Sequence, residues 1–173
     1  MTDPTRPPTT DPAATVSFIL DGESVSVIDD GGSLLAALRD RLGVRTPKDG
    51  CSPQGQCGCC TVLVDGSPRV ACVTPLRRMA GRHVTTVDGL AEGRAERWAA
   101  AFDAVGASQC GFCTPGIICR FEGLRRAGTT PGDTDRAARA LQAHLCRCTG
   151  WLTILEAWRL GADEGELPTG EGR

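Results

Sequence analysis

The sequence predicts an α+β fold in which a strand-rich first half is followed by an all-helical second half. Over residues 15–90, apolar and polar side chains alternate between Asp-Gly turns, as they do in half-buried strands. From about residue 91, apolar side chains instead recur three and four positions apart, as on one face of a helix. The length of 173 residues allows two small domains, and domains of that size often depend on a metal or another cross-link for stability.

Two β-hairpins and one further strand are predicted in the first half. The first hairpin pairs TVSFIL with ESVSVI across the Asp-Gly turn at residues 21–22. The second pairs TVLV with SPRVAC across the Asp-Gly turn at residues 65–66. A last short strand, HVTTV, is predicted at residues 83–87. These elements together predict a sheet of strands around a single helix.

That helix is predicted directly after the first hairpin. Ser33 is a suitable N-cap, leucines at helical spacing run from Leu34 to Leu42, and Gly43 provides a C-terminal stop. Residues 44–60, which follow, are too long to be an idle connection in a compact domain. Because this loop carries four of the ten cysteines, we expect it to hold the functional site of the first half.

Four helices are predicted in the second half from the spacing of their apolar residues. They lie around residues 95–105, 114–124, 134–145 and 151–158. The second of them begins with Thr114 and Pro115, and proline is favoured at the first helical position. The predicted organisation is therefore a disordered leader at 1–14, a strand-rich domain at 15–90, a four-helix domain at 91–162 and a disordered tail at 163–173.

Charge and compartment exclude several classes of function. A net charge of -2 and a pI of about 5.7 indicate neither nucleic-acid binding nor attraction to an anionic membrane. The N-terminus lacks the basic and apolar regions of a secretory signal, and no apolar run approaches the length of a membrane span. We therefore expect a soluble, cytoplasmic chain, in which ten cysteines indicate metal binding or redox chemistry more than disulfides.

Four cysteines of the first half are spaced like the ligands of a 2Fe-2S cluster. Three lie in the loop and a fourth follows the next strand: Cys51, Cys57, Cys60 and Cys72. The plant-type pattern has four residues in its first gap, and this chain has five. Structural zinc is the alternative, although such sites usually use two short paired motifs. Cys59 lies between two of the ligands, and we expect it to point away from them as a small buried residue.

The second half contains two short cysteine pairs that are predicted to lie at facing helix ends. These are Cys110 with Cys113, in a CxxC motif, and Cys146 with Cys148, in a CxC motif. Together they can close one four-thiolate site, and a helix N-terminus favours the thiolate needed for ligation. A thioredoxin-like redox pair is the alternative, but the CxxC motif lacks a preceding strand. Cys119 falls among apolar neighbours within a helix and is expected to be part of the core.

The cysteine motifs resemble those of a known family. CSPQGQCGCCTVLVDG, ACVTP, QCGFCTPG and CRCTG resemble the small iron-sulfur subunit of the molybdenum hydroxylases, the xanthine dehydrogenase and aldehyde oxidase superfamily, over residues 15–160. The resemblance implies a β-grasp, plant-type ferredoxin-like domain with one 2Fe-2S cluster, followed by a four-helix-bundle domain with a second. It places the two ligand sets on the eight cysteines named above. Here the first loop has one extra residue, and Cys59 stands where the family commonly has a small residue such as Ala.

The resemblance also implies a function and partners. The chain would pass electrons from a molybdopterin centre in a large subunit through both clusters to FAD on a medium subunit. Gln109 matches a family glutamine that contacts the molybdopterin cofactor. No catalytic residue is expected in this chain, because it has no cluster of His, Asp and Glu around an open metal position. We therefore expect the iron-sulfur subunit of an oxidoreductase complex that turns over no substrate alone.

Two alternatives belong to other classes of function. A free ferredoxin that shuttles electrons among enzymes would not need the appended helical domain. A zinc-stabilised interaction module would be colourless, whereas two iron-sulfur clusters make a protein red-brown. The histidines at positions 83 and 144 are interpreted as ordinary strand or helix residues. Arginines at positions 120, 125, 126 and 147 fit a docking face or, more simply, a solvated helix surface.

Overall fold

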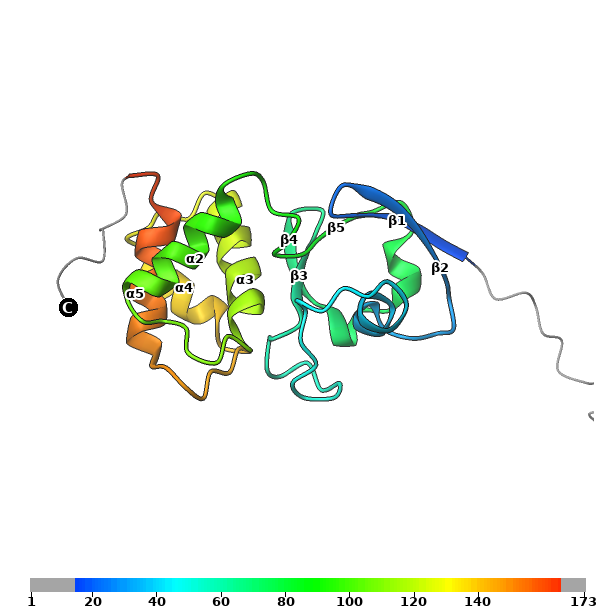
Figure 1. Cartoon of the computed structure of the whole chain (residues 1–173), viewed down its shortest axis with the longest axis horizontal. Helices are drawn as coiled ribbons and strands as arrows, with labels where there is room; N and C mark the ends of the chain where they lie inside the picture. Colours follow the sequence, from blue (N-terminus) through cyan, green and yellow to red (C-terminus); the bar gives the residue numbers. More distant parts are fainter. Residues whose placement is uncertain (1–14, 166–173) are drawn as a thin grey trace, which may run out of the picture.

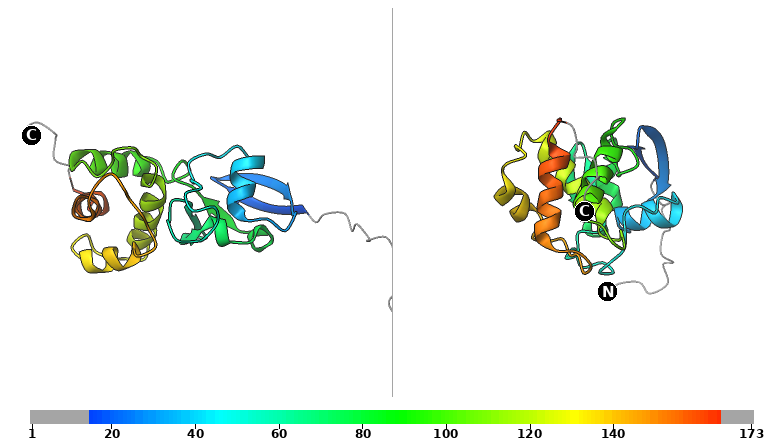
Figure 2. Two further views of the ribbon diagram at one scale, coloured as in Figure 1. Left: turned by 90° about the horizontal axis from the view of Figure 1, so that it is seen from below. Right: turned by 60° about the vertical axis from the view of Figure 1, so that its left-hand side comes forward.

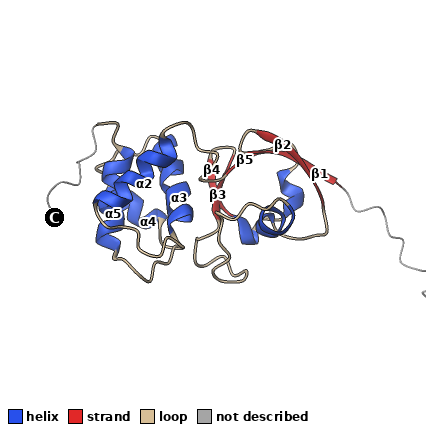
Figure 3. Cartoon of the chain, in the orientation of Figure 1, coloured by secondary structure: helices blue, strands red, loops and turns tan. Residues whose placement is uncertain are grey.

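A computed structural model describes residues 15–165 of the chain. A strand-rich half and a helical half lie side by side along the longest axis of the molecule (Figures 1 and 3). The predicted leader at residues 1–14 lies outside the described residues, as does the part of the predicted tail beyond residue 165.

The strands form one five-stranded sheet in the order β2-β1-β5-β3-β4. β1 (Thr15–Leu20) pairs antiparallel with β2 (Glu23–Ile28), and β3 (Thr61–Val64) pairs antiparallel with β4 (Ser67–Val70). Both predicted hairpins are thus confirmed. β5 (His83–Thr85) lies between them, parallel to β1 and antiparallel to β3.

The strand at residues 83–87 is shorter than the sequence predicts. It ends at Thr85 because the next backbone amide bonds to a side chain and not to a strand. The amide of Thr86 donates to Asp21 Oδ1 at 2.7 Å. The Thr86 hydroxyl donates to Asp21 Oδ2 at 2.8 Å. The first Asp-Gly turn is thereby tied to the end of β5.

Two predicted elements of the first half differ in type from the prediction. The helix predicted from Leu34 to Leu42 is a short α-helix, α1 (Leu34–Ala36), that continues as a wider π-helical turn over Ala37–Arg41. Ser33 caps it as predicted, its hydroxyl accepting from the Ala36 amide at 3.2 Å. The predicted strand SPRVAC ends at Val70, so that Cys72 lies in a 3-10 turn, Ala71–Val73.

The helical half consists of α2 (Arg94–Ala104), α3 (Thr114–Arg126), α4 (Thr134–Ala140) and α5 (Trp151–Ala162). The views in Figure 2 show α5 beside both α2 and α4. α4 is five residues shorter than predicted, because the segment after Ala140 turns away to meet the cysteine loop of the first half.

Aromatic packing forms the centre of the helical core. Trp98 from α2 stacks on Trp158 from α5 with ring centroids 6.1 Å apart, and Phe121 from α3 lies 5.7 Å and 5.3 Å from these two rings. All three side chains are fully buried. α2 and α5 approach so closely that a Cβ on Gly161 would lie 2.2 Å from the Trp98 ring.

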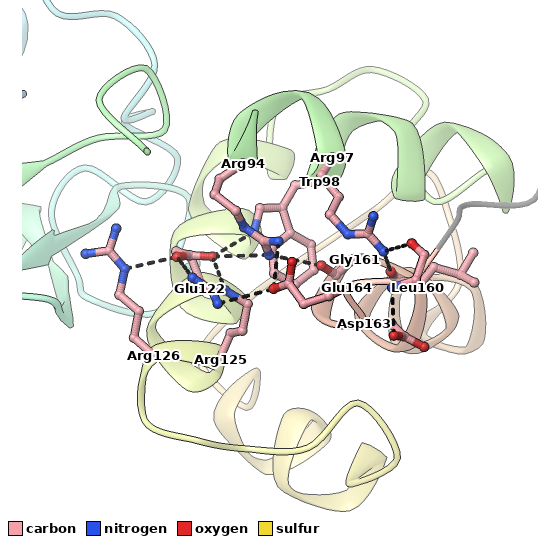
Figure 4. A network of polar contacts seen from close by, with 11 residues as sticks. Arg94, Arg97, Trp98, Glu122, Arg125, Arg126, Leu160, Gly161, Asp163 and Glu164 are labelled. Carbon is pink, nitrogen blue, oxygen red and sulfur yellow. Dashed lines mark hydrogen bonds and ion pairs between the residues drawn. The ribbon is translucent and has the colours of Figure 1, made fainter. Parts of the chain in front are cut away.

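A buried carboxylate ties the helices together next to this core (Figure 4). Glu122, on α3, has a side chain that is 0% exposed. It accepts hydrogen bonds from Trp98 Nε1 at 3.0 Å, Arg125 Nη2 at 2.8 Å and Arg126 Nε at 3.0 Å. Arg94 on α2 lies 3.6 Å from the same carboxylate and 3.3 Å from Glu164, which follows α5. Glu122 therefore joins α2 to α3, and Arg94 extends the network through a second carboxylate, Glu164, to the residues after α5.

The two halves share a close interface between α3 and the edge of the sheet formed by β3 and β4 (Figure 1). Gly123 faces Pro68 so tightly that a Cβ there would lie 2.2 Å from the proline ring. Leu63 of β3 is buried within the helical core, together with Cys57 and Cys59. The cysteine loop of the first half therefore lies at the junction of the halves.

Candidate iron-sulfur centres

The first predicted ligand set is brought together by the loop, the start of β3 and the turn after β4. Cys57 and Cys60 are buried just before β3, Cys72 is buried in the 3-10 turn, and Cys51 is half-buried in the loop. The thiol of Cys51 lies near those of Cys57 and Cys72, and the thiol of Cys60 lies near that of Cys72. All four thiols thus belong to one connected group.

Backbone amides point at the sulfurs of this group. The amide of Gln54 donates to Cys51 Sγ at 3.4 Å, and that of Cys72 donates to Cys60 Sγ at 3.4 Å. Burial alone would raise the pKa of Cys51, but amide donors from Gln56, Cys57 and Gln54 outweigh it and lower that pKa to about 6. Such donors stabilise thiolate sulfur and, in iron-sulfur sites, tune the metal centre.

The second predicted set lines a cavity of about 460 Å³ at the other side of the same junction. Cys113 is buried at the start of α3, and Cys146 is half-buried in the loop before α5. Their thiols lie near each other, and the exposed Cys110 and Cys148 make a second neighbouring pair. The four predicted thiols therefore surround one opening, with two of them at the protein surface.

The pKa values of this set differ with exposure. Burial raises the pKa of Cys113 to about 12. For Cys146, burial is outweighed by the hydroxyl and amide of Thr149, which lower its pKa; the Thr149 hydroxyl oxygen and the Cys146 sulfur lie 3.1 Å apart. A bound metal would remove the remaining protons, because only deprotonated thiols serve as ligands.

Cys59 lies closer to both sets than the sequence suggests. It is buried, but its sulfur lies 3.5 Å from the Cys57 carbonyl oxygen and lines the cavity of the second set. Burial, followed by the nearby Cys57 and Cys113 thiols, raises its pKa to about 12. Its spacing placed it between two ligands of one set, whereas the fold places it between the two sets. Cys119 is buried in α3, with a pKa raised by burial.

Gln109 precedes Cys110 in the loop that leads to α3 and is exposed. Its amide can therefore reach a group outside this chain, at the side of the molecule where Cys110 and Cys148 are also exposed. Phe112 and Leu145, which line the same cavity, are 44% and 62% exposed.

A direct backbone contact joins the two sets. The amide of Leu145 donates to the carbonyl of Cys57 at 2.9 Å. Leu145 immediately precedes Cys146, so one hydrogen bond connects a residue of the first set to the neighbour of a residue of the second. His144, interpreted from sequence as an ordinary residue, is buried beside this contact, at 1% exposure. In the sequence, only its position two residues before Cys146 indicates that His144 lies near the site.

The donor chemistry fits two iron-sulfur clusters. Each site offers four cysteine sulfurs, as a 2Fe-2S cluster requires, and backbone amides donate to sulfur in both sites. Within residues 15–165, no three His, Cys, Asp or Glu side chains converge as ligands of a single ion. A two-iron cluster differs from a single ion in sharing its four thiolates between two metals.

Comparison with known proteins defines the class of this protein. Residues 18–80 match the model of the 2Fe-2S iron-sulfur cluster binding domain, and residues 86–159 match that of the [2Fe-2S] binding domain. The chain is therefore an iron-sulfur protein with two consecutive 2Fe-2S-binding regions.

Individual relatives identify the family more narrowly. The chain is 34% identical to the nicotinate dehydrogenase small FeS subunit of Eubacterium barkeri, over 86% of this chain and 95% of the relative. It is 37% identical to one of the nicotinate dehydrogenase subunits of Pseudomonas putida, over 89% and 98% respectively. Against xanthine dehydrogenase of Drosophila pseudoobscura pseudoobscura it is 38% identical, but it spans only 12% of that longer protein.

Solved structures agree with the sequence relatives. Quinoline 2-oxidoreductase from Pseudomonas putida 86 contains a chain with a TM-score of 0.76 and 33% identity, covering 86% of this chain and 92% of that one. Aldehyde oxidoreductase from Desulfovibrio gigas gives a TM-score of 0.78 and 32% identity, covering 86% of this chain and 17% of that one.

The chain belongs to the family of small iron-sulfur subunits of the molybdenum hydroxylases. Members of this family are electron-transfer subunits or domains of oxidoreductases. Their cofactors are 2Fe-2S clusters, with molybdopterin and FAD held by other subunits or domains. In the described part of this chain, every helix is too short or too polar to span a bilayer.

Proposed function

We propose that this chain carries electrons from a molybdopterin centre on a large partner subunit, through two clusters in series, to FAD on another subunit or to another acceptor. A bound 2Fe-2S cluster accepts and releases a single electron, and so splits the two-electron oxidation of a substrate into single steps. The observation that carries this proposal is the pair of four-thiol groups at one junction, linked by the Leu145–Cys57 hydrogen bond.

The proximity of the thiols supports one assignment of the ligands of the two clusters. Cys51, Cys57, Cys60 and Cys72 would hold the first cluster, and Cys110, Cys113, Cys146 and Cys148 the second. The domains that hold them would comprise residues 15–90 and 91–162, of β-grasp and four-helix-bundle type respectively. In this assignment Cys59 is not a ligand.

Exposure supports the order in which electrons pass. Cys110 and Cys148 are exposed, and Gln109 lies beside Cys110, whereas three of the four cysteines of the first set are buried. Electron donation from a separate subunit requires close approach, which the exposed set permits. The second cluster would therefore receive electrons from molybdenum, with Gln109 contacting the pterin, and the first would pass them on.

Metal analysis and electron paramagnetic resonance of the purified full chain test this proposal. We expect about four irons and four labile sulfides per chain, because each 2Fe-2S cluster contributes two of each. The dithionite-reduced protein should show two distinguishable signals, since three cysteines of the first set are buried whereas two of the second set are exposed. A colourless protein that binds zinc, or a single signal with two irons, would contradict the proposal.

The chain alone should oxidise no substrate, whereas the complex with its large subunit should transfer electrons to the acceptor. Turnover of an aldehyde or an N-heterocycle by the isolated chain would also contradict the proposal.

A further inference from the structure

His144 makes a polar contact between the two halves, directly beside both cluster-binding segments. Its Nε2 atom lies 3.2 Å from the hydroxyl oxygen of Thr61, the first residue of β3. His144 and Thr61 are each 1% exposed. Thr61 immediately follows Cys60, and His144 lies two residues before Cys146, so this one contact spans both predicted ligand sets.

The hydrogens of this contact can be assigned from the partners present. The Thr61 hydroxyl donates its only hydrogen to the carbonyl of Gly58, at 2.7 Å. It can then only accept from the imidazole, which must carry its hydrogen on Nε2. The two hydrogen bonds therefore run in one direction, from the His144 Nε2–H to the Thr61 hydroxyl and from that hydroxyl to the Gly58 carbonyl. Gly58 lies in the loop that holds Cys57 and Cys60.

The same loop is held from a second side. A Cβ on Gly58 would lie 2.4 Å from the His144 ring, so the imidazole packs directly on the loop backbone. A Cβ on Gly116, from α3, would lie 2.3 Å from the Gly58 carbonyl oxygen. The segment Cys57–Cys60 is therefore clamped between α3 and His144, in the register that brings the Cys57 carbonyl to the Leu145 amide.

We propose that His144 and Thr61 are a positioning pair that holds the Cys57 carbonyl against the Leu145 amide and so fixes the electronic contact between the two cluster sites. This inference rests on the proposed function. The step it governs moves one electron from the reduced second cluster to the oxidised first cluster, with no bond or proton changing place. Leu145 is covalently bonded to Cys146. The hydrogen bond from the Leu145 amide to the Cys57 carbonyl therefore completes a path from Cys146 to Cys57 that consists of covalent bonds and one hydrogen bond.

Variants of Thr61 test this inference on the full chain with both clusters present. Thr61→Val keeps the shape of the side chain but removes the hydroxyl, and Thr61→Ser restores it. His144→Leu removes the other partner. Thr86→Val is the matched control, because Thr86 is an equally buried threonine whose hydroxyl bonds to Asp21, outside both cysteine sets.

Two measurements respond to the contact and not merely to folding. Hydrogen exchange by mass spectrometry reports protection of the Leu145 amide, and paramagnetic resonance of the fully reduced chain reports the magnetic interaction between the clusters. We expect Thr61→Val and His144→Leu to keep the iron content of the wild type, lose protection at Leu145 and show a weaker interaction between the two signals. Thr61→Ser and Thr86→Val should match the wild type in both measurements.

The possible failures are distinguishable. Unchanged protection and an unchanged magnetic interaction in Thr61→Val would overturn the positioning role while leaving the proposed function intact. Loss of iron from both Thr61→Val and His144→Leu would also overturn it, because the pair would then be needed for cluster assembly and not for the contact. A wild type that holds fewer than two clusters would end both proposals together.

Discussion

The thiols at the junction have different surroundings although they are close neighbours in sequence. Cys59 and Cys60 are both buried, with pKa values raised to about 12 chiefly by burial, but only Cys60 receives a backbone amide, from Cys72. Cys59 instead faces the cavity of the second set and lies 3.5 Å from the Cys57 carbonyl oxygen. The direction of a side chain, and not its burial, thus separates the two roles proposed here.

Substitution of individual cysteines tests the assignment of ligands. We expect Cys57→Ser to lose one of the two paramagnetic signals and about two of four irons, because a hydroxyl is a poorer iron ligand than a thiolate. Cys59→Ala and Cys119→Ser should retain both signals. Iron analysis of these three purified variants, and of Cys60→Ala, checks this. Loss of the first cluster in Cys59→Ala, with its retention in Cys60→Ala, would show that the extra loop residue has shifted the ligand set.

Gln109 can be tested separately from the clusters. In the complex with the large subunit, Gln109→Ala should slow cluster reduction by substrate, because the lost hydrogen bond perturbs the pterin without touching a ligand. Reduction by dithionite should be unchanged. Stopped-flow absorbance with each reductant measures both rates, and an equal substrate-driven rate in the variant would exclude the proposed contact.

At the level of elements, the helical half is held by α3, which carries a buried charge at its centre. Burial alone would raise the pKa of Glu122, but hydrogen bonds from Arg125, Trp98 and Arg126 outweigh it and lower that pKa to about 2. The carboxylate therefore stays charged in the core and links α2 to α3, while Arg94 bridges it to Glu164 after α5. Its arginines remain 11% to 34% exposed, so only the carboxylate has left water completely.

This carboxylate predicts a defined dependence of stability on pH. A carboxyl whose folded pKa lies below its usual value near 4.5 stabilises the fold above that value and loses the contribution as pH falls toward 2. We expect Glu122→Gln to destabilise the chain by about 3 kcal/mol at pH 7, as for a broken buried ion pair with partly solvated partners. Urea unfolding followed by tryptophan fluorescence measures the difference.

The difference between wild type and Glu122→Gln should be constant above about pH 5 and shrink below the usual carboxyl pKa. Acid also weakens cluster binding, but it does so in both proteins. The difference between their free energies of unfolding therefore reports the contribution of Glu122. A difference that persists unchanged to pH 3 would refute the charged state proposed for this side chain.

The sequence predicted the type and order of nearly all elements, because hairpin turns and helical spacing are local signals. It failed where distant groups decide the structure. β5 stops at Thr85 because Asp21, more than sixty positions earlier, binds the next amide. α4 stops at Ala140 because Leu145 bonds to Cys57. In the same way, spacing predicted which cysteines form two groups but did not predict that Cys59, Thr61 and His144 lie between the groups.

At the scale of the whole molecule, exposed apolar side chains lie in or directly after the segments that carry the second set of cysteines. Phe112 and Leu145 line its cavity, and Trp151 and Leu152, at the start of α5, are 44% and 84% exposed. Trp151 follows Cys148 by three positions, and in the proposed electron path the donating partner approaches the exposed Cys110 and Cys148. We therefore expect the large subunit to cover these apolar side chains.

A charge in place of one of these side chains should weaken the complex. Leu152→Asp is expected to cost about 2 kcal/mol of binding free energy, or about 30-fold in Kd, as for a central interface residue. Ile28→Asp is the matched control, because Ile28 is 59% exposed on β2, at the far end of the molecule (Figure 1). Titration calorimetry against the large subunit measures both. Equal affinities for the two variants would place the large subunit elsewhere.

The position of β5 has a consequence for how the chain folds as it is synthesised. This three-residue strand, although last in sequence, separates the two hairpins in the sheet that residues 15–165 form, so each hairpin bonds to β5 and not to the other. The hairpins can form early, since their contacts are local, but the parallel pairing of β5 with β1 closes a loop of about sixty residues. The two hairpins therefore cannot join into one sheet until the ribosome has released residues 83–85. The first half completes its fold only as the second half begins to emerge.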